Sequence, residues 1–126
     1  MENKELIAQC ELVARQWIES PLYDEETKKG VKALMDAEDK SGLIDAFYKT
    51  LEFGTGGLRG IMGPGTNRMN VYTVGAATQG LANYLNKCFA ARKEISVVIG
   101  YDCRNNSEYF AETCANIFSA NGIKVF

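Results

Sequence analysis

The sequence contains no histidine. This absence excludes Ser-His-Asp and Cys-His catalytic arrangements, and histidine-ligated metal sites, from these residues. The four cysteines include no C-x-x-C pair, which argues against a zinc ribbon or a thioredoxin-type site. Cys10, Cys88 and Cys114 fall on apolar faces of predicted helices, so we expect buried, reduced thiols there. Cys103 follows a predicted strand, and nothing around it marks a nucleophile.

Long apolar runs and a strong net charge are also missing. No run approaches the roughly 18 residues that cross a bilayer, and Met1 to Leu12 is polar and mixed in charge, unlike a secretory signal. The net charge of −2 gives no support to a nucleic-acid or acidic-membrane partner. We therefore expect a cytoplasmic protein with neither partner. With 126 residues and 46% hydrophobic content, the chain is one domain, or a piece of one, with a real core.

Residues 1–50 are charged and have helical patterns. Apolar residues recur at helical spacing before Pro21, namely at Leu6, Cys10, Val13 and Trp17. Asp24 is a predicted N-cap, with Glu25 and Glu26 in the first turn, where the helix dipole favours acids. A third helix is predicted from the spacing of Ile44, Phe47, Tyr48 and Leu51. We expect residues 1–50 to form a helical extension packed on residues 51–126.

The segment from Leu51 to Asn70 is rich in glycine. Six of the 12 glycines fall between Gly54 and Gly65. Glycine lets the backbone approach a ligand closely and adopt positive φ. Thr55 adds a hydroxyl to this segment and Arg59 adds a guanidinium. A turn that exposes its N–H groups beside a guanidinium suits an anion, and phosphate is the commonest one.

The segment does not fit the two common nucleotide-binding motifs. A Walker A loop requires Gly-Lys-Ser/Thr at the start of a helix, but Gly65 is followed by Thr66 and Asn67. In a G-x-G-x-x-G reading that starts at Gly54, the last glycine position is occupied by Arg59. Glycine content alone therefore leaves two interpretations open, a phosphate-binding turn and a hairpin that binds no ligand.

The pattern after Glu52 predicts alternating strands and helices. Residues 52–62 look extended, a Gly-Pro-Gly turn follows, and residues 68–72 are predicted to return as a strand, with Thr73 capping a helix. The predicted apolar face of that helix is formed by Val74, Ala77, Thr78, Leu81, Leu85 and Cys88. Two glycines in it, Gly75 and Gly80, are interpreted as sites of close packing, because each weakens a helix by about 1 kcal/mol relative to Ala.

The last third of the sequence predicts a βαβ unit. Residues 95–101 are a continuous apolar run, typical of a central parallel strand. Ser107 is predicted to cap a helix that extends to Ala120 and ends at Asn121-Gly122, and residues 123–126 begin another strand. Such units are right-handed, and ligands gather at the carboxyl ends of their strands, here residues 102–106.

Two motifs resemble a known family. Residues 53–60, F-G-T-G-G-L-R-G, resemble the first signature of the α-D-phosphohexomutase superfamily, which contains phosphoglucomutase and phosphomannomutase. Residues 51–70, with the G-P-G turn and R-M-N, look like the phosphopentomutase-like subgroup. Residues 100–104, G-Y-D-C-R, resemble the G-x-D-x-R element of the family. The resemblance covers essentially the whole chain and implies domain I of a four-domain enzyme.

The resemblance implies a sugar-phosphate mutase. Family members move a phosphoryl group between the 1- and the 6- or 5-position of a sugar through an active-site phosphoserine, with a sugar bisphosphate as intermediate and activator. Mg²⁺ neutralises charge during the transfer. Carried over, Arg59 is the catalytic residue beside the transferred phosphate, and Thr55, Gly56 and Gly57 bind phosphate with it. A lysine could not reproduce the two parallel hydrogen bonds of the arginine fork.

The sequence departs from the family because the motifs T-A-S-H-N-P and D-G-D-x-D-R are absent. The serine, the Mg²⁺ ligands and the sugar site are therefore expected outside this chain. The expected fold is an incomplete three-layer αβα sandwich with a mixed sheet, preceded by helices. Asp102 and Arg104 are expected to support the phosphoserine loop, although a simple surface turn is an alternative.

Three alternatives follow for the function of the chain. The first is a part of a mutase, inactive by itself, whose partners are a sugar phosphate and the remaining domains. The second is a non-catalytic phosphosugar-binding module, and the third is a folding unit without ligand affinity. Because the expected strand at residues 123–126 leaves an unpaired sheet edge, we also expect the isolated chain to self-associate.

Overall fold

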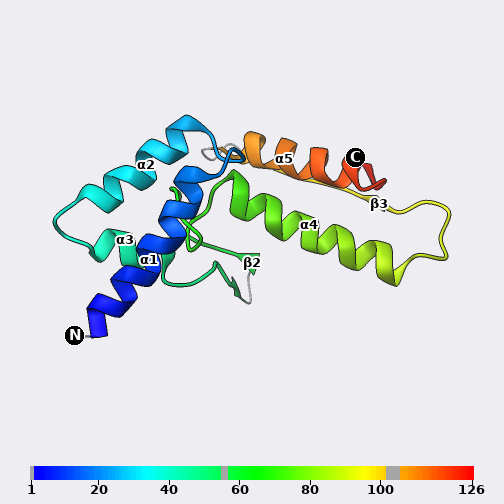
Figure 1. The fold of residues 1–126 in the computed structure, drawn as a ribbon. Coiled ribbons are helices and arrows are strands. Elements are labelled where there is room, and N and C mark those ends of the chain that lie inside the picture. Colours follow the sequence, from blue (N-terminus) through cyan, green and yellow to red (C-terminus); the bar gives the residue numbers. More distant parts are fainter. Residues whose placement is uncertain (1, 55–56, 102–105) are drawn as a thin grey trace. The chain divides into compact units, whose positions relative to one another are not determined.

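The residues pack into two units, which meet in the sequence between Asn70 and Val71. Unit 1 spans Met1–Asn70 and unit 2 spans Val71–Phe126. The computed structural model, drawn in Figure 1, describes residues 2–54, 57–101 and 106–126. The domain boundary at residue 50, which we drew from the sequence, stays a prediction.

Unit 1 begins with three helices, α1 (Glu2–Glu19), α2 (Glu25–Asp36) and α3 (Ser41–Phe47). They lie against one another, as Figure 1 shows. The predicted cap of α2 is confirmed, because the Asp24 carboxylate accepts a hydrogen bond of 2.7 Å from the Thr27 N–H. Such a bond satisfies one of the backbone donors that a helix start leaves without a partner.

Aromatic rings fill the core between these helices. The Trp17 ring is buried, stacks on Tyr23 with centroids 4.3 Å apart and meets Phe47 edge-on at 5.5 Å. Both geometries are the favourable ones for aromatic pairs. Around the rings, each helix contributes fully buried residues, among them Cys10, Ala14, Val31, Leu43 and Ala46.

The third helix is shorter than the spacing predicted. It ends at Phe47, and Leu51 lies outside it. The reason is a tertiary one, because the Leu51 N–H donates to the Thr66 carbonyl at 2.9 Å and the Thr66 hydroxyl donates to the Lys49 carbonyl at 2.7 Å. Those bonds replace the continuation of the helix.

The glycine-rich segment folds back on itself. Strands β1 (Phe53–Gly54) and β2 (Gly57–Leu58) pair in the antiparallel direction, with Phe53 opposite Leu58 and Gly54 opposite Gly57. The prediction of one extended run over residues 52–62 is therefore wrong. The antiparallel pairing makes this part of the segment a hairpin.

The predicted strand at residues 68–72 is also wrong. Only one bridge, between Met62 and Met69, forms there among the described residues. Helix α4 (Val71–Cys88) already begins at Val71, so Thr73 lies inside its first turn and is not the cap. The predicted Gly-Pro-Gly bend at residues 63–65 does form.

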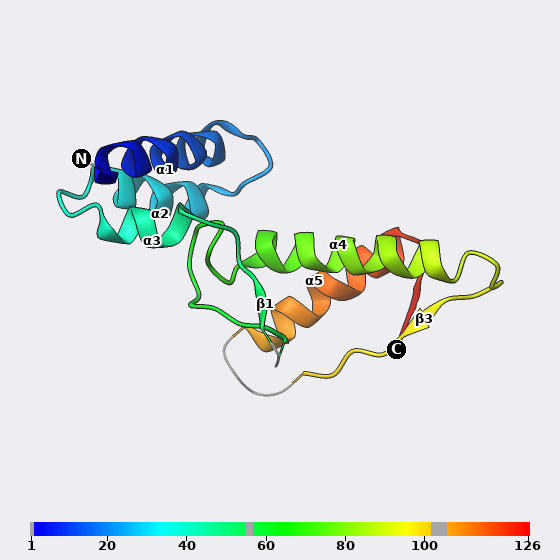
Figure 2. The same ribbon diagram turned by 90° about the horizontal axis from the view of Figure 1, so that it is seen from below.

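Unit 2 contains α4, β3 (Ser96–Val97), α5 (Ser107–Ala120) and β4 (Lys124–Val125). Strands β3 and β4 are parallel, with Ser96 opposite Lys124. The pairing continues with the Ile99 N–H donating to the Phe126 carbonyl at 3.1 Å. The predicted βαβ connection is confirmed, and Figure 2 shows α4 and α5 side by side.

The core of unit 2 lies between the two helices and one face of the two-stranded sheet. Ala82, Phe118 and Ile123 are its buried members, and partly buried residues pack around them, namely Leu85, Ile95, Val97, Ile99, Cys114 and Val125. Neighbouring strand residues point to opposite faces. Val98 is accordingly 82% exposed, whereas Val97 and Ile99 pack on the core.

The end of α5 follows the prediction and its start does not. Asn121 is the C-cap and Gly122 has φ of +76°, a value that favours glycine. Asn106 occupies the N-cap position with φ of +64°. Ser107 is thus the first helical residue and not the predicted cap.

The buried face of α4 is rotated from the predicted one. Val74, Thr78 and Ala82 are buried, whereas Leu81 is 47% exposed and Cys88 is exposed as well. The predicted burial of the Cys88 thiol is therefore wrong. The three buried residues are spaced by four and so lie on one side of the helix. Helix α5 packs against α4 and decides which side is buried.

The two glycines of α4 have different surroundings. A Cβ at Gly75 would lie 3.2 Å from Ile117 Cδ1, so close packing with α5 is confirmed there. No atom lies within 4 Å of a Cβ placed at Gly80, so close packing does not explain that glycine.

An incomplete α/β domain preceded by helices is therefore confirmed. The described strands form two separate sheets, one antiparallel and one parallel, each of two strands. Within the described residues these pairs do not join into one mixed sheet.

Candidate functional site

The structure describes two of the predicted phosphate-binding residues, Gly57 in the hairpin and Arg59 just after it. Gly57 has φ of +103°, and no atom lies within 4 Å of a Cβ placed on it. Glycine is therefore required here by backbone conformation and not by close packing. Thr55 and Gly56 lie outside the described residues.

Arg59 follows the second strand of the hairpin directly. Its side chain is exposed, and it forms no ion pair or hydrogen bond with any residue that the structure describes. A guanidinium presents its donors in a planar fork that matches two oxygens of one phosphate. The position therefore leaves the whole fork open to a ligand.

Arg68, the other arginine of this segment, has a structural role. Its Nη2 lies 2.7 Å from Asp45 Oδ2, and its side chain is only 14% exposed. Nη1 donates to the backbone carbonyls of Asp45 and Asn67, at 3.2 Å each. Arg68 is committed to α3, whereas Arg59 is not committed to any described residue.

Gly60 lies against the Leu51 side chain, immediately after Arg59. A Cβ at this position would lie 2.6 Å from Leu51 Cδ1, a distance that real side chains do not tolerate. The missing side chain therefore lets the backbone pass against Leu51 without a shift of the leucine side chain. Two successive needs, positive φ at Gly57 and close approach at Gly60, explain the glycines that flank Leu58 and Arg59.

The second predicted group is not placed by the structure. Asp102 and Arg104 lie outside the described residues, as does Cys103. Tyr101, just before them, is 62% exposed. The structure therefore neither joins these residues to the hairpin nor separates them from it, and their supporting role stays a prediction.

The sequence did not predict that the Gly-Pro-Gly turn packs closely against α2 and α3. At Gly65, φ is +134° and a Cβ would lie 2.5 Å from the Ala46 carbonyl oxygen. A Cβ at Gly30 of α2 would lie 3.0 Å from Pro64 Cγ. The G-P-G element predicted the turn itself, but nothing in the sequence indicated its contact with α2 and α3.

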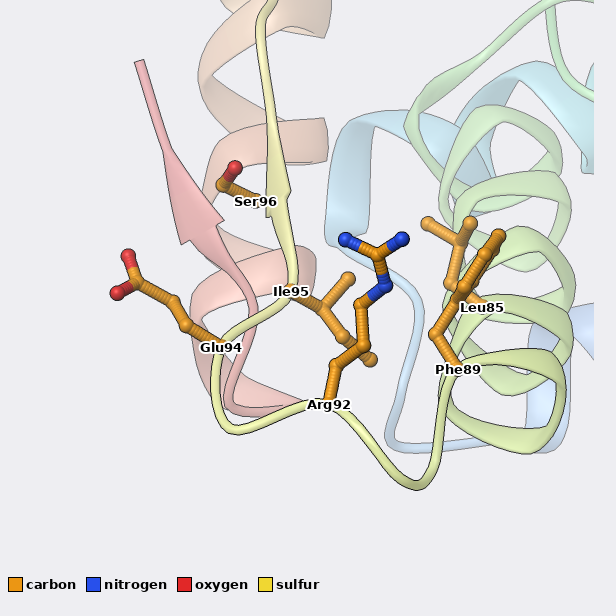
Figure 3. A pocket seen from close by; sticks show the side chains of 6 residues that line it. All are labelled: Leu85, Phe89, Arg92, Glu94, Ile95 and Ser96. Atoms are coloured by element: carbon orange, nitrogen blue, oxygen red, sulfur yellow. The ribbon is translucent and has the colours of Figure 1, made fainter.

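Unit 2 has a hollow of about 280 Å³ at the amino end of β3. Its lining residues, shown in Figure 3, are Leu85, Phe89, Arg92, Glu94, Ile95 and Ser96. Arg92 extends between Ile95 and the α4 residues, with its guanidinium 5.6 Å from the Phe89 ring centroid. Ligands of parallel sheets bind at the opposite, carboxyl ends of strands. This hollow is therefore not our candidate site.

The shifted pKa values of Cys10, Asp39 and Tyr84 have local structural causes. Burial raises the pKa of the Cys10 thiol, and hydrogen bonds from the backbone and hydroxyl of Ser41 lower the pKa of Asp39. A hydrogen bond with the Cys88 thiol raises the pKa of Tyr84. Each shift is explained by one neighbour or by desolvation, so none of them marks an acid–base pair.

The described residues include no group of three acidic or cysteine side chains that could hold a metal ion. They also include no helix long and apolar enough to span a bilayer. We assign no Mg²⁺ ligand to the described part of the chain.

Residues 50–126 match the profile of the family described as "Phosphoglucomutase/phosphomannomutase, alpha/beta/alpha domain I". The chain belongs to this family. The matched region contains the glycine hairpin, Arg59 and the βαβ unit. The resemblance stated from the two sequence motifs is thereby confirmed.

Curated relatives carry mutase names. A "Probable phosphoribomutase" of Schizosaccharomyces pombe is 40% identical over 103 residues, which are 82% of this chain and 18% of that protein. The phosphopentomutase of Homo sapiens is 40% identical over 106 residues, 79% of this chain and 17% of that protein. A Staphylococcus aureus phosphoglucomutase is 40% identical over 91 residues, 71% of this chain and 16% of that protein.

The chain thus spans less than a fifth of the length of the curated relatives it matches. No solved structure matches the chain.

Proposed function

We propose that this chain is the part of a sugar-phosphate mutase that presents Arg59 to the transferred phosphate. The observation that carries the proposal is the exposed guanidinium of Arg59, next to a positive-φ glycine hairpin in the matched domain. An arginine without a described partner keeps its full hydrogen-bonding capacity for an anion. The Arg68 guanidinium, by contrast, is already bound to the carboxylate and carbonyl of Asp45 in α3.

In the proposed reaction, a phosphoserine donates its phosphoryl group to a sugar phosphate, and the resulting bisphosphate returns its other phosphate to the serine. Charge on the phosphoryl oxygens is the main object of stabilisation in such transfers. Arg59 would hold two of those oxygens. The hairpin would add backbone N–H groups, whose approach the missing Cβ of Gly57 permits. The described residues offer no Mg²⁺ site, and no step here depends on one.

The names of the relatives guide the choice of substrate. The Schizosaccharomyces pombe and Homo sapiens relatives are named as a probable phosphoribomutase and a phosphopentomutase. We therefore propose a pentose 1-phosphate as the first substrate to test. Glucose 1-phosphate and mannose 1-phosphate complete the panel, because the family description covers both hexose activities.

Kinetics of the whole protein test the role of Arg59. Arg59→Lys keeps the charge but loses the planar fork. We therefore expect a loss of about 1.4 to 4 kcal/mol of transition-state stabilisation, which lowers kcat/KM tenfold to nearly a thousandfold. Arg15→Lys is the matched control, because Arg15 is an exposed arginine of α1. An unchanged kcat/KM in Arg59→Ala would reject the assignment.

A phosphosugar-binding module without catalysis is the second candidate. The whole protein would then bind sugar phosphates through Arg59 but show no turnover with any substrate of the panel. We further propose that the isolated chain of 126 residues has no mutase activity, since the family's serine motif is absent from it. Self-association of the isolated chain is a separate proposal, supported by the exposure of Val98 and Phe126 on the outer sheet face.

A further inference from the structure

We propose that Asp45 of α3 is a positioning residue for the arginine hairpin. It acts through Arg68, which anchors the turn that holds the segment following Arg59. The inference rests on the proposed function, because the group that it positions is the phosphate-binding guanidinium. It gives the N-terminal helices a part in the site, where the sequence suggested only an extension.

The first link joins the segment after Arg59 to Met69. The Met69 N–H donates to the Ile61 carbonyl at 2.8 Å, and the Gly63 N–H donates to the Met69 carbonyl at 3.2 Å. Met62 forms a bridge with Met69 as well. These bonds hold the backbone of residues 61–63 against Met69.

The second link joins Arg68, the residue before Met69, to α3. One guanidinium nitrogen of Arg68 contacts the Asp45 carboxylate at 2.7 Å and the other contacts the Asp45 carbonyl at 3.2 Å. Asn67 strengthens the same junction, because its Nδ2 donates to the Asp45 carbonyl at 3.0 Å and its N–H donates to the Ala46 carbonyl at 2.9 Å. Asp45 therefore receives bonds from two successive residues of the turn.

The third link closes the turn itself. Asn70 Nδ2 donates to the carbonyls of Gly63 and Gly65, at 2.9 and 3.0 Å. The seat of Gly65 against Ala46 leaves no room for a side chain. The turn of residues 63–70 is thus closed by its own hydrogen bonds and rests on α3. The glycine hairpin precedes this turn in the sequence.

The energetics separate positioning from simple stability. The Asp45 side chain is 57% exposed and that of Arg68 is 14% exposed, and an ion pair with one partner open to solvent contributes less to folding stability than a fully buried pair. Catalytic and binding geometry is far more sensitive, since a displacement of about 1 Å can cost about a hundredfold in rate. Losing the Asp45 carboxylate should therefore affect Arg59 more than it affects unfolding.

Nuclear magnetic resonance of the 126-residue chain tests the inference in two steps. The first step compares backbone amide shifts and hydrogen exchange at Gly57 and Arg59, without ligand, between the wild type and Asp45→Asn. The second step follows the Arg59 Nε–H signal during titration with inorganic phosphate. We expect Asp45→Asn to perturb both hairpin amides and to weaken the phosphate response at Arg59 by about tenfold.

Two further variants make the result specific. Asp45→Glu restores the carboxylate and should recover most of the wild-type behaviour. Asp36→Asn makes the same chemical change at an exposed residue of α2 and should change neither readout. If Asp45→Asn leaves the hairpin amides and the Arg59 response unchanged, and only lowers the unfolding temperature, Asp45 is merely structural and the inference is wrong.

The proposed function fails through a different observation. If the Arg59 signal of the wild type does not respond to phosphate, Arg59 is not the phosphate ligand. The hairpin amides in the ligand-free chain still decide whether Asp45 sets the backbone geometry there.

Discussion

Gly65→Ala should destabilise unit 1 strongly, for two separable reasons. The first is backbone strain, since φ of +134° lies in a region that residues with a Cβ avoid, at a cost of about 1–3 kcal/mol. The second is overlap, because the new Cβ would lie 2.5 Å from the Ala46 carbonyl oxygen and 2.9 Å from the Ala46 Cβ. Overpacking of this kind costs about 1–3 kcal/mol more.

The overlap cannot be relieved cheaply. Ala46 is buried in α3, and its carbonyl oxygen already accepts the Asn67 N–H at 2.9 Å. Moving Gly65 away from Ala46 would break that bond or shift the turn that carries Arg68. We therefore expect a total loss of about 2–6 kcal/mol in the free energy of unfolding.

Gly63→Ala is the matched control. Gly63 also has positive φ, at +153°, but the nearest atom to its Cβ would be Arg68 Cδ at 3.9 Å, an ordinary contact. This variant has the strain without the overlap, so it should lose only about 1–3 kcal/mol. The difference between the two variants measures the contact with Ala46.

The fluorescence of Trp17 reports the result. It is the only tryptophan of the chain, and it is buried in the core of unit 1. Urea unfolding followed at this residue gives the stability of unit 1 without a signal from unit 2. In thermal unfolding, Gly65→Ala should melt at least about 4 °C below Gly63→Ala. Equal stability of the two variants would refute the reasoning, because the overlap with Ala46 would then have no cost.

Three further predictions concern single side chains outside the hairpin. Gly80→Ala should stabilise α4 by about 1 kcal/mol in thermal melts followed by circular dichroism, since its Cβ would meet open space; no gain would show an unseen constraint. Under native conditions iodoacetamide should label exposed Cys88 and leave Cys10 unmodified until unfolding, because Cys10 is buried and its thiol pKa is raised; equal labelling by mass spectrometry would contradict this. Hydrogen bonds from Ser41 lower the pKa of Asp39, so its stabilising effect should be present above about pH 4 and lost at lower pH. The unfolding free energies of the wild type and Asp39→Ala should therefore converge at low pH, and an Asp39 titration midpoint above about 3.9 would contradict this.

The helices could be predicted because their signals are local. Asp24 caps α2 and Asn121-Gly122 ends α5, as their residue types indicate. Capping depends on a few neighbouring atoms, and the sequence states which atoms are present. The family could also be read from residues 53–60, because a motif of that kind needs no knowledge of contacts.

Local signals failed wherever a distant residue decided the conformation. Helix α3 ends before Leu51 because Thr66 takes over its N–H. The buried face of α4 follows its contact with α5, which leaves Leu81 and Cys88 exposed. Spacing along the sequence gives the period of a helix but does not say which side will meet a neighbour.

The candidate site shows the same division. By itself, the sequence determined that Arg59 sits among glycines in a phosphomutase motif, since residue type and order are sufficient for that statement. Only the tertiary structure decided that Arg68 is bound to Asp45 while Arg59 is exposed, because the difference depends on bonds across 23 positions of the chain. Two arginines only nine positions apart acquire different roles, because the fold brings a carboxylate to Arg68 and leaves Arg59 in solvent.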